Sequence, residues 1–191
     1  MKRRAELEQQ TKLRITKSAV TLHGSLGPSR TSVSAIAEHA GVRRSTLYRH
    51  FPDELALFTA CTTHWLARNP LPELKHWAVL ANADERLRIA LQELYPYYGR
   101  TERMLTNILR DEETMPIVKQ MLGNYRRYLA EARDTIMRDR NLTEPSRARV
   151  RAAVGHVLSF HVWRSLAIEQ GLDNATCARL MVLLVEAAAR K

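Results

Sequence analysis

Apolar residues recur along most of the chain at the three- and four-residue spacings that place them on one face of an α-helix. Near the start, Ile15, Ala19, Leu22 and Leu26 form such a stripe. The seven glycines and seven prolines fall mainly between segments of this kind, where they end helices rather than separate strands. The pattern predicts an all-α protein, with helices at about residues 2–23, 31–39, 43–49, 53–67, 82–96, 102–110, 116–140, 145–170 and 174–190.

Capping residues and prolines mark several of these boundaries. Asn82 and Glu85 stand three residues apart, as in a capping box, and Asp53 can cap the helix that follows it. Pro96 is expected to kink or end its helix, because proline lacks the N–H that a helix interior needs. The segment 68–72 contains two prolines and is the predicted hinge between two regions.

Residues 31–51 have the pattern of a helix-turn-helix, in which a second helix is held at a fixed angle to the first. Gly41 stands where the chain must reverse, and Ala37 is small enough for the two helices to approach closely. The second helix of this motif enters the major groove of DNA. The expected inward face consists of Ile36, Ala37, Ala40, Val42, Leu47 and Phe51.

The residues around Leu47 that point outward are suited to DNA. Arginine can bond to both acceptors of a guanine edge, which discriminates between bases by about 1 to 3 kcal/mol. Hydroxyl and imidazole groups suit phosphate contacts that fix the register, and a helix N-terminus also favours phosphate. The predicted DNA-binding residues are Thr31, Ser32, Arg43, Arg44, Ser45, Thr46, Tyr48, Arg49 and His50.

Charge supports a polyanionic partner. The 191 residues carry a net charge of +10, and residues 1–60 hold ten Lys or Arg against five Asp or Glu. The two cysteines, Cys61 and Cys177, lie far apart in apolar stretches, which suits thiols in a reducing cytoplasm. No apolar run approaches the roughly 18 residues of a membrane span. We therefore expect a cytoplasmic protein without a membrane partner.

The same motif resembles the N-terminal domain of TetR-family transcriptional regulators over about residues 10–62. The resemblance implies a three-helix DNA-binding domain, here residues 1–52, and a larger helical domain, residues 53–191, that binds a small-molecule effector and forms a homodimer. It rests on Gly27, Thr31-Ser-Val33, Ile36-Ala37, Ala40-Gly-Val42, Thr46-Leu-Tyr48, His50-Phe51 and Leu57-Phe58.

Two positions depart from the family pattern. Glu54 stands where the family usually has a lysine near a DNA phosphate, and Arg43 stands where a small capping residue is usual. A carboxylate at Glu54 favours the helix dipole but repels phosphate. Arg43 gives up a side-chain cap worth about 1 kcal/mol.

The larger region offers two sets of candidates. Aromatic and methionine side chains make adaptable walls for a small molecule, although the same residues also form ordinary cores. Two apolar stripes, on the last two long predicted helices, require a partner, which is either the internal core or a second subunit. The candidate effector residues are Trp65, Trp77, Tyr95, Tyr98, Met104, Met121, Tyr125, Phe160 and Trp163. The candidate dimer residues are Val150, Val154, Val157, His161, Cys177, Met181, Leu184 and Ala188.

The leading interpretation is a DNA-binding regulator, expected to be a repressor that an effector releases from a pseudo-palindromic operator. Activation in place of repression stays open, and the alternatives are a non-specific DNA-coating protein and a helical enzyme. The sequence contains none of the motifs H-E-x-x-H, G-x-S-x-G, G-x-G-x-x-G or a Walker loop. Cys61 and His64 share a helix face but do not complete a zinc site. We therefore expect no catalysis, no cofactor and no metal.

Overall fold

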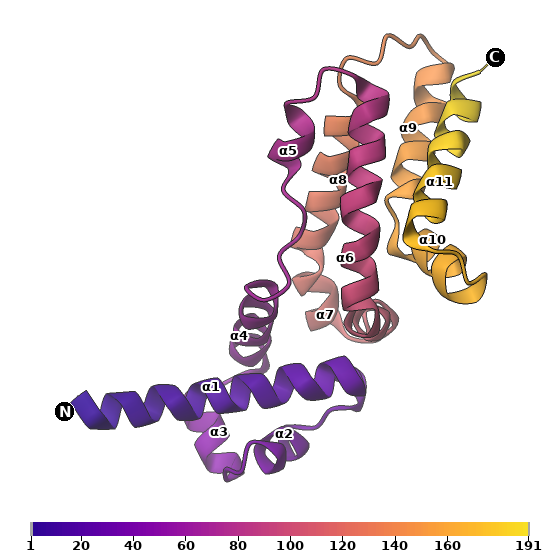
Figure 1. The fold of residues 1–191 in the computed structure, drawn as a ribbon. Helices are drawn as coiled ribbons and strands as arrows, with labels where there is room; N and C mark the ends of the chain where they lie inside the picture. Colours follow the sequence, from indigo (N-terminus) through magenta and orange to yellow (C-terminus); the bar gives the residue numbers. More distant parts are fainter. Residues whose placement is uncertain (1, 191) are drawn as a thin grey trace. The chain divides into compact units, whose positions relative to one another are not determined.

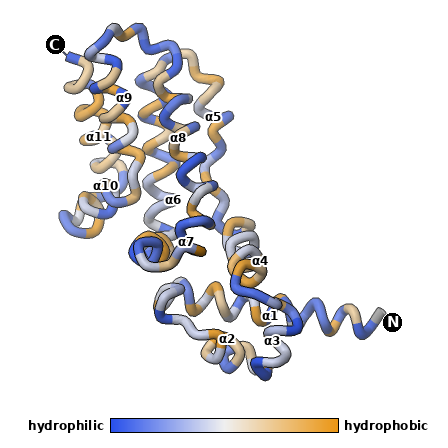
Figure 2. Tube along the Cα trace, turned by 180° about the vertical axis from the view of Figure 1, so that it is seen from behind, coloured by the Kyte–Doolittle hydropathy of each residue, from blue (hydrophilic) through white to orange (hydrophobic). Residues whose placement is uncertain are grey.

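The computed structural model describes residues 2–190, and every regular element in that range is helical, as predicted. Packing divides the chain into two compact units. Unit 1 comprises the chain up to Pro70 together with Arg103–Gly123, and unit 2 comprises Leu71–Glu102 together with the chain from Asn124 onward. The boundary after Pro70 falls inside the segment predicted as a hinge. Figure 1 shows the elements, and Figure 2 shows apolar and hydrophilic residues recurring in turn along the helices.

Unit 1 is built around α1, which contacts α2, α3 and α4. The last turns of α6 and the short α7 also belong to this unit. The elements are α1 (Lys2–Ser25), η1 (Pro28–Arg30), α2 (Val33–His39), α3 (Arg44–His50), α4 (Glu54–Leu66), the end of α6 (Ala83–Asp111) and α7 (Pro116–Met121).

Unit 2 contains most of α6 and the C-terminal helices, of which α9 and α11 pack side by side (Figure 1). Its remaining elements are α5 (Leu74–Ala78), α8 (Gly123–Met137), α9 (Ser146–Val157), α10 (Phe160–Arg164), the π-helical turn η2 (Ser165–Glu169) and α11 (Asn174–Ala189).

The expected inward face of the turn-helix motif is confirmed. Leu47 and Phe51 are buried together with Ile36, and Val42 packs against the same core. Each fully buried side chain of this size contributes about 1.5 to 3 kcal/mol relative to exposure. The cluster also contains Ile15 and Ala19 of α1, as well as Ala37, Ala40, Leu57 and Cys61. The apolar stripe of α1 is therefore what holds the two short helices in place.

Gly41 makes the reversal between α2 and α3. It has φ +64°, a left-handed conformation that favours glycine. Its N–H donates to Glu38 O at 2.9 Å, and the N–H of Val42 donates to Ala37 O at 2.9 Å. These two bonds are the pair that closes a helix in a Schellman motif. The angle between the helices is therefore fixed by backbone geometry as well as by the core.

The predicted caps are largely present. Asp53 accepts from the N–H of Ala56 at 2.7 Å, and Asn82 accepts from the backbone N–H of Glu85 at 3.0 Å. Ser32 caps α2 by accepting from Ala35 N at 3.1 Å. Arg43 occupies the N-cap position of α3 without a side-chain hydrogen bond, as expected for the residue that replaces a small cap.

Three expectations about helix boundaries are wrong. Of the two outcomes expected at Pro96, a kink or an end, the end is wrong, since α6 continues to Asp111. The buried side chains of Tyr95 and Tyr97 flank this proline, and their burial offsets the roughly 3 kcal/mol that an interior proline costs. The predicted helix 116–140 is divided at Leu122, and the predicted helix 145–170 is divided after Val157 and again at η2.

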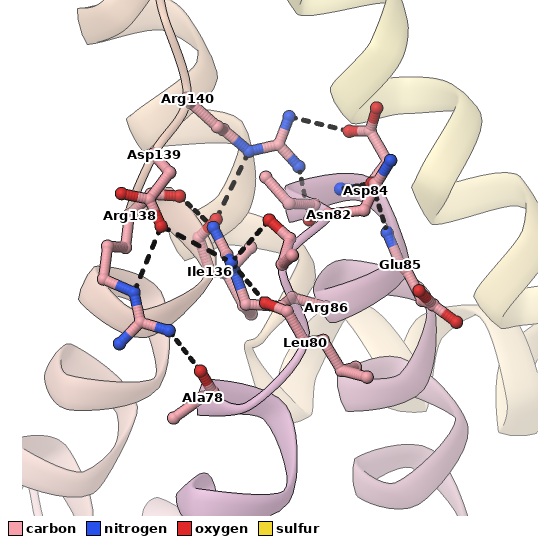
Figure 3. A network of polar contacts seen from close by, with 12 residues as sticks. Ala78, Leu80, Asn82, Asp84, Glu85, Arg86, Ile136, Arg138, Asp139 and Arg140 are labelled. Atoms are coloured by element: carbon pink, nitrogen blue, oxygen red, sulfur yellow. Dashed lines mark hydrogen bonds and ion pairs between the residues drawn. The ribbon is translucent and has the colours of Figure 1, made fainter.

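A group of arginines joins the end of α8 to the loop between α5 and α6 (Figure 3). Arg86 is fully buried and donates to Leu80 O at 2.6 Å, to Ala81 O at 3.1 Å and to Arg138 O. Asp139 lies 3.8 Å from its guanidinium. Leu80 and Ala81 lie in the loop between α5 and α6, and Arg138 directly follows the end of α8, so no helical N–H pairs with these carbonyls.

Two further arginines of this group, which lie beyond the end of α8, also bond to backbone carbonyls of α5 and α6. Arg138 donates to Ala78 O, and Arg140 donates to Ala83 O at 3.0 Å while pairing with Asp84 at 2.8 Å. Their charges are therefore used to satisfy backbone oxygens within unit 2.

Candidate nucleic-acid interface

The outward face of α3 is a surface of unpaired cations. Arg44, Ser45, Tyr48 and Arg49 are exposed, whereas Leu47 on the opposite side is buried. Arg43, immediately before the helix, is also exposed. Within the described chain, none of these three arginines forms an ion pair. The helix therefore presents guanidinium groups that remain available to a ligand.

The side chains of Arg44 and Tyr48 contact each other on this face. The Arg44 guanidinium lies 6.0 Å from the centroid of the Tyr48 ring, and Nη2 lies 3.5 Å from the tyrosine hydroxyl. A cation over an aromatic face is attracted by about 0.5 to 1 kcal/mol at an exposed site. This contact limits the conformations of Arg44 while leaving its outer N–H groups free.

The start of α2 brings two hydroxyls to the surface. Ser32 accepts a bond from the backbone, so its own proton remains free to donate. Thr31 donates to Gly27 O at 2.7 Å and retains only lone pairs. Ser32 is therefore better suited to donate to a phosphate oxygen than Thr31.

Thr46 and His50 are half-buried. Nε2 of His50 is enclosed without a hydrogen-bond partner, which leaves Nδ1 as the ring nitrogen able to reach a phosphate. Sequence reasoning missed Lys12, whose ammonium lies 5.5 Å from the centroid of the Phe51 ring at the end of α3. Lys12 stands one helical turn before the buried Ile15, and this spacing in the sequence could have identified it as a candidate.

The end of α6 completes the helix-turn-helix unit, which the sequence did not reveal. Asn107 donates to Gly24 O at 2.9 Å and to His23 O at 3.3 Å. Arg103 donates to Ser25 O at 3.3 Å, and Arg110 donates to Leu26 O at 3.0 Å. Side chains of α6 thus satisfy the last carbonyls of α1, which have no partner inside the helix.

Asp111 ties the same helix to η1. Its carboxylate accepts from Ser29 N at 2.9 Å and from Arg110 Nε at 2.7 Å. Burial alone would raise the pKa of Asp111, but the bonds from Arg110 and Ser29 hold it below its ordinary value. The carboxylate therefore stays ionised at this junction.

The predicted effector residues fall into separate groups. Trp65, Met104 and Met121 belong to unit 1, and Trp77 packs edge-on against Tyr128 with ring centroids 6.4 Å apart. The other five, all in unit 2, are Tyr95, Tyr98, Tyr125, Phe160 and Trp163.

These five residues form an aromatic cluster, which we call the tyrosine cluster. The Tyr98 ring lies 5.5 Å from that of Phe160 and 5.9 Å from that of Trp163. The hydroxyl of Tyr125 donates to that of Tyr98 at 3.1 Å. Burial raises the pKa of Tyr125 to about 12, so its hydroxyl stays protonated.

Two hydroxyls of the tyrosine cluster reach the break between α9 and α10. Tyr98 donates to Leu158 O at 2.6 Å, and Tyr95 donates to Val157 O at 2.9 Å. The break leaves these carbonyls without helical partners, and the tyrosines supply them.

Most of the predicted dimer stripe lies inside the chain. Val150, Val154 and Val157 of α9 are fully buried, as is Cys177 of α11, and Met181 is 8% exposed. Since α9 and α11 pack on each other, these residues form their shared core. The large apolar residues of α11 that are exposed are Leu180, Leu183 and Leu184, at 42%, 58% and 41%.

Cys61 and His64 do not form a metal site. Burial raises the pKa of the Cys61 thiol to about 12, so the thiolate that a metal needs is disfavoured. Nδ1 of His64 lies 3.2 Å from Arg68 Nη1. Among residues 2–190, no three His, Cys, Asp or Glu side chains converge as metal ligands. Nor does any helix in that range combine the length and hydropathy needed to cross a bilayer.

Comparison with known proteins points to the same helix-turn-helix. The sequence model of the family 'Bacterial regulatory proteins, tetR family' matches residues 15–61, from the buried half of α1 to α4. Residues 15–61 are therefore similar to the N-terminal domain of tetR-family regulatory proteins. This match supports the prediction of a DNA-binding regulator. No curated protein matches the sequence.

Solved structures share the fold over the whole chain. A TetR-like transcriptional regulator from Rhodococcus sp. RHA1 has a TM-score of 0.67 at 18% identity, covering 95% of this chain and 97% of that one. FadR from Bacillus subtilis, solved with stearoyl-CoA, has a TM-score of 0.61 at 16% identity, covering 93% and 99%. A tetR-family regulator from Streptomyces coelicolor has a TM-score of 0.60 at 17% identity, covering 94% and 79%.

Proposed function

We propose that this TetR-family regulator is a cytoplasmic repressor that binds a pseudo-palindromic operator as a homodimer and leaves it when a small-molecule effector binds. The observation that carries the DNA-binding role is the face of α3. Its exposed arginines have no acidic partner in the described chain, and the buried Leu47 fixes the direction in which they point. A recognition helix needs this combination of free donors and a rigid base.

The surface divides into reading and positioning residues. Arg44 reads a guanine edge, because its fork can bond both major-groove acceptors, and Arg43 and Arg49 extend the same face. Ser32 and Tyr48 donate to phosphates and set the register. Thr31, Ser45, Thr46 and His50 complete the proposed interface.

A second copy of the chain is the proposed partner for the exposed leucines of α11. Leu180, Leu183 and Leu184 lie within one and a half turns of the helix, so a monomer would leave three large apolar side chains in water. A two-fold axis beside α11 would pair this face with itself. The dimer would present two α3 helices to half-sites about 34 to 36 Å apart.

The tyrosine cluster is the proposed effector site within residues 53–191. Its rings offer an apolar surface, and its hydroxyl oxygens keep lone pairs that can accept hydrogen bonds, although their protons are donated within the protein. An effector that prefers the conformation with poorly spaced α3 helices must weaken operator binding by the same coupling free energy. About 1 to 3 kcal/mol changes the affinity 5- to 150-fold.

Fluorescence anisotropy tests the DNA-binding role. The protein is titrated with DNA from beside its own gene and with a shuffled duplex, at about 0.15 M salt. We expect a preference of about 10³-fold or more for one duplex, saturating at two chains per duplex. Equal binding to every duplex, including those selected from a random pool, would support a DNA-coating protein instead.

Sedimentation tests the dimer with one double variant. Replacing Leu183 and Leu184 by Glu is expected to yield a monomer that binds one half-site weakly, because like charges would meet across the axis. Replacing Leu13, an exposed leucine of α1, by Glu is the matched control and should leave the dimer intact. A wild-type monomer at micromolar concentration would contradict this part of the proposal.

A further inference from the structure

Unit 1 contains a cavity of about 400 Å³ between the end of α1, the start of α2, the start of α4 and the turn between α6 and α7. Its apolar side is formed by Ile36, Leu57 and Phe58. The volume suits a molecule with one ring or a short alkyl chain, at the lower end of the range for ligand sites. The cavity lies entirely within unit 1 and is separate from the tyrosine cluster of unit 2.

His23 lines this cavity and is 5% exposed. Its ring stacks on Phe58 with centroids 5.0 Å apart. Burial lowers the pKa of His23 to about 4 in spite of the nearby Asp111, so the imidazole is neutral at pH 7. Within the described chain, neither ring nitrogen makes a hydrogen bond. The ring nitrogens are not among the fully enclosed atoms without a partner, so His23 adds a neutral donor and acceptor to the cavity wall.

The remaining polar side chains of the cavity are Ser29, Thr31, Thr114 and Glu54, and the Ser29 hydroxyl already bonds to the Asp111 carboxylate. The hydroxyl of Thr31 donates to Gly27 O at 2.7 Å, and that of Thr114 donates to Asp111 O at 3.3 Å. Both therefore present only lone pairs to the cavity. Glu54 adds a carboxylate that is exposed and has no ion pair among the described residues.

We propose that this cavity binds a small cationic amine with an apolar body. The ammonium group lies at the Glu54 carboxylate, and the Thr31 and Thr114 oxygens accept its N–H bonds. The apolar body packs on Phe58 and Leu57, beside the unpaired ring of His23. An ammonium carries three donors and no acceptor, which complements this lining.

The test uses the full chain and 2-phenylethylamine, with 2-phenylethanol as a neutral probe of the same shape. Both are titrated at pH 7 while the amide resonances and the imidazole nitrogens of His23 are followed by NMR. We expect saturable shifts at His23, Thr31 and Thr114, with the amine bound about two- to fivefold more tightly than the alcohol, as for an exposed charge pair.

Variants separate the charge from the cavity. Replacing Glu54 by Gln should remove the preference for the amine while leaving binding of the alcohol unchanged. Replacing Glu113, an exposed glutamate on the adjacent turn that does not line the cavity, by Gln should change neither affinity. Replacing Thr114 by Phe should fill the opening and abolish binding of both probes, with thermal melting used to verify that the variant folds.

Two results would overturn the proposal. Equal affinity for the two probes, or an amine preference that survives Glu54→Gln, would reject the amine assignment. No saturable shift at His23 up to about 10 mM probe would reject the site itself. None of these measurements involves DNA, so their failure is distinguishable from failure of the proposed function.

Discussion

Arginines serve different purposes on α3 of unit 1 and at the junction of α6 with the end of α8 in unit 2. On α3, Arg43, Arg44 and Arg49 are exposed and have no acidic partner in the described chain. Arg86 of α6, together with Arg138 and Arg140 beyond the end of α8, directs its donors to backbone carbonyls (Figure 3). The residue type is the same, but only the first group has donors left for a ligand.

The comparison shows that net charge does not locate a DNA-binding surface. The net charge is +10, yet several arginines direct their donors to backbone carbonyls of the chain itself. What distinguishes the α3 face is unused hydrogen-bonding capacity on a helix whose other side is buried. The following predictions test this distinction, beginning with the largest expected change in the free energy of unfolding or binding.

Replacing Arg86 by Met should lower the free energy of unfolding by about 3 to 5 kcal/mol, because buried carbonyls would lose their donors. Urea unfolding monitored by tryptophan fluorescence measures the change. Arg88→Met on the exposed side of the same helix is the matched control, with a change expected within about 0.5 kcal/mol. A small effect of Arg86→Met would mean that water molecules take over the hydrogen bonds to the carbonyls in the variant.

His23 differs from Arg86, because it is a buried ionisable group of unit 1 whose side chain makes no hydrogen bond within the described chain. Its pKa lies at about 4 in the folded chain and near 6.5 when unfolded. Between these values the unfolded state binds more protons, so stability falls as the pH falls, by about 3 kcal/mol in total. In His23→Phe this contribution should be missing when unfolding curves at pH 7 and pH 4 are compared. A parallel loss in both proteins would assign it to other groups.

Replacing Arg44 by Ala should lower affinity for the preferred duplex by about 1 to 3 kcal/mol, and affinity for a shuffled duplex by less. The stability should stay within about 0.5 kcal/mol of wild type, because the side chain is exposed. Arg44→Lys keeps the positive charge but loses the bidentate guanidinium, so it should restore the affinity for the shuffled duplex but not the preference for the preferred one. Equal losses on both duplexes would reduce Arg44 to a phosphate contact.

Tyr48→Ala should weaken binding to all duplexes by a similar amount, about 1 kcal/mol, because its hydroxyl positions the helix without reading bases. Anisotropy with the preferred and shuffled duplexes measures both values. Tyr48→Phe keeps the ring under Arg44 and should separate the hydroxyl from the stacking. A loss confined to the preferred duplex would make Tyr48 a base-reading residue.

Sequence reasoning predicted the turn-helix motif well because its determinants are local. Gly41 supplies the left-handed turn, Ser32 and Asp53 cap their helices, and Leu47 lies at a helical spacing from Phe51. Each of these signals depends on residues no more than four positions apart. The short range of these interactions is what makes them visible in one sequence.

The remaining features depend on contacts that no local pattern records. Arg86 meets Arg138 O across 52 positions, and Asn107 meets Gly24 O across 83. Periodicity placed Val150 and Cys177 on apolar faces, but it cannot distinguish a face that packs within the chain from one that packs on a second copy. Pro96 was misjudged because the burial of its neighbours is a tertiary effect.

Glu54 acquires a different interpretation from the structure. In sequence it was only a departure from the lysine usual in the family. In the fold it lines the cavity of unit 1 beside Thr31. A carboxylate that is unfavourable near phosphate is favourable beside an amine, so one substitution can exchange one contact for another.

The bonds between α6 and the last turn of α1 have a consequence for dissecting the protein. A protease or a cloning strategy would naturally cut at the prolines near residue 70, since the family match ends at residue 61. The resulting fragment would lack Arg103, Asn107 and Arg110, and the carbonyls of Gly24, Ser25 and Leu26 would face water. The compact unit that contains the helix-turn-helix is discontinuous in sequence, and its second segment begins at Arg103, more than thirty residues beyond the cut.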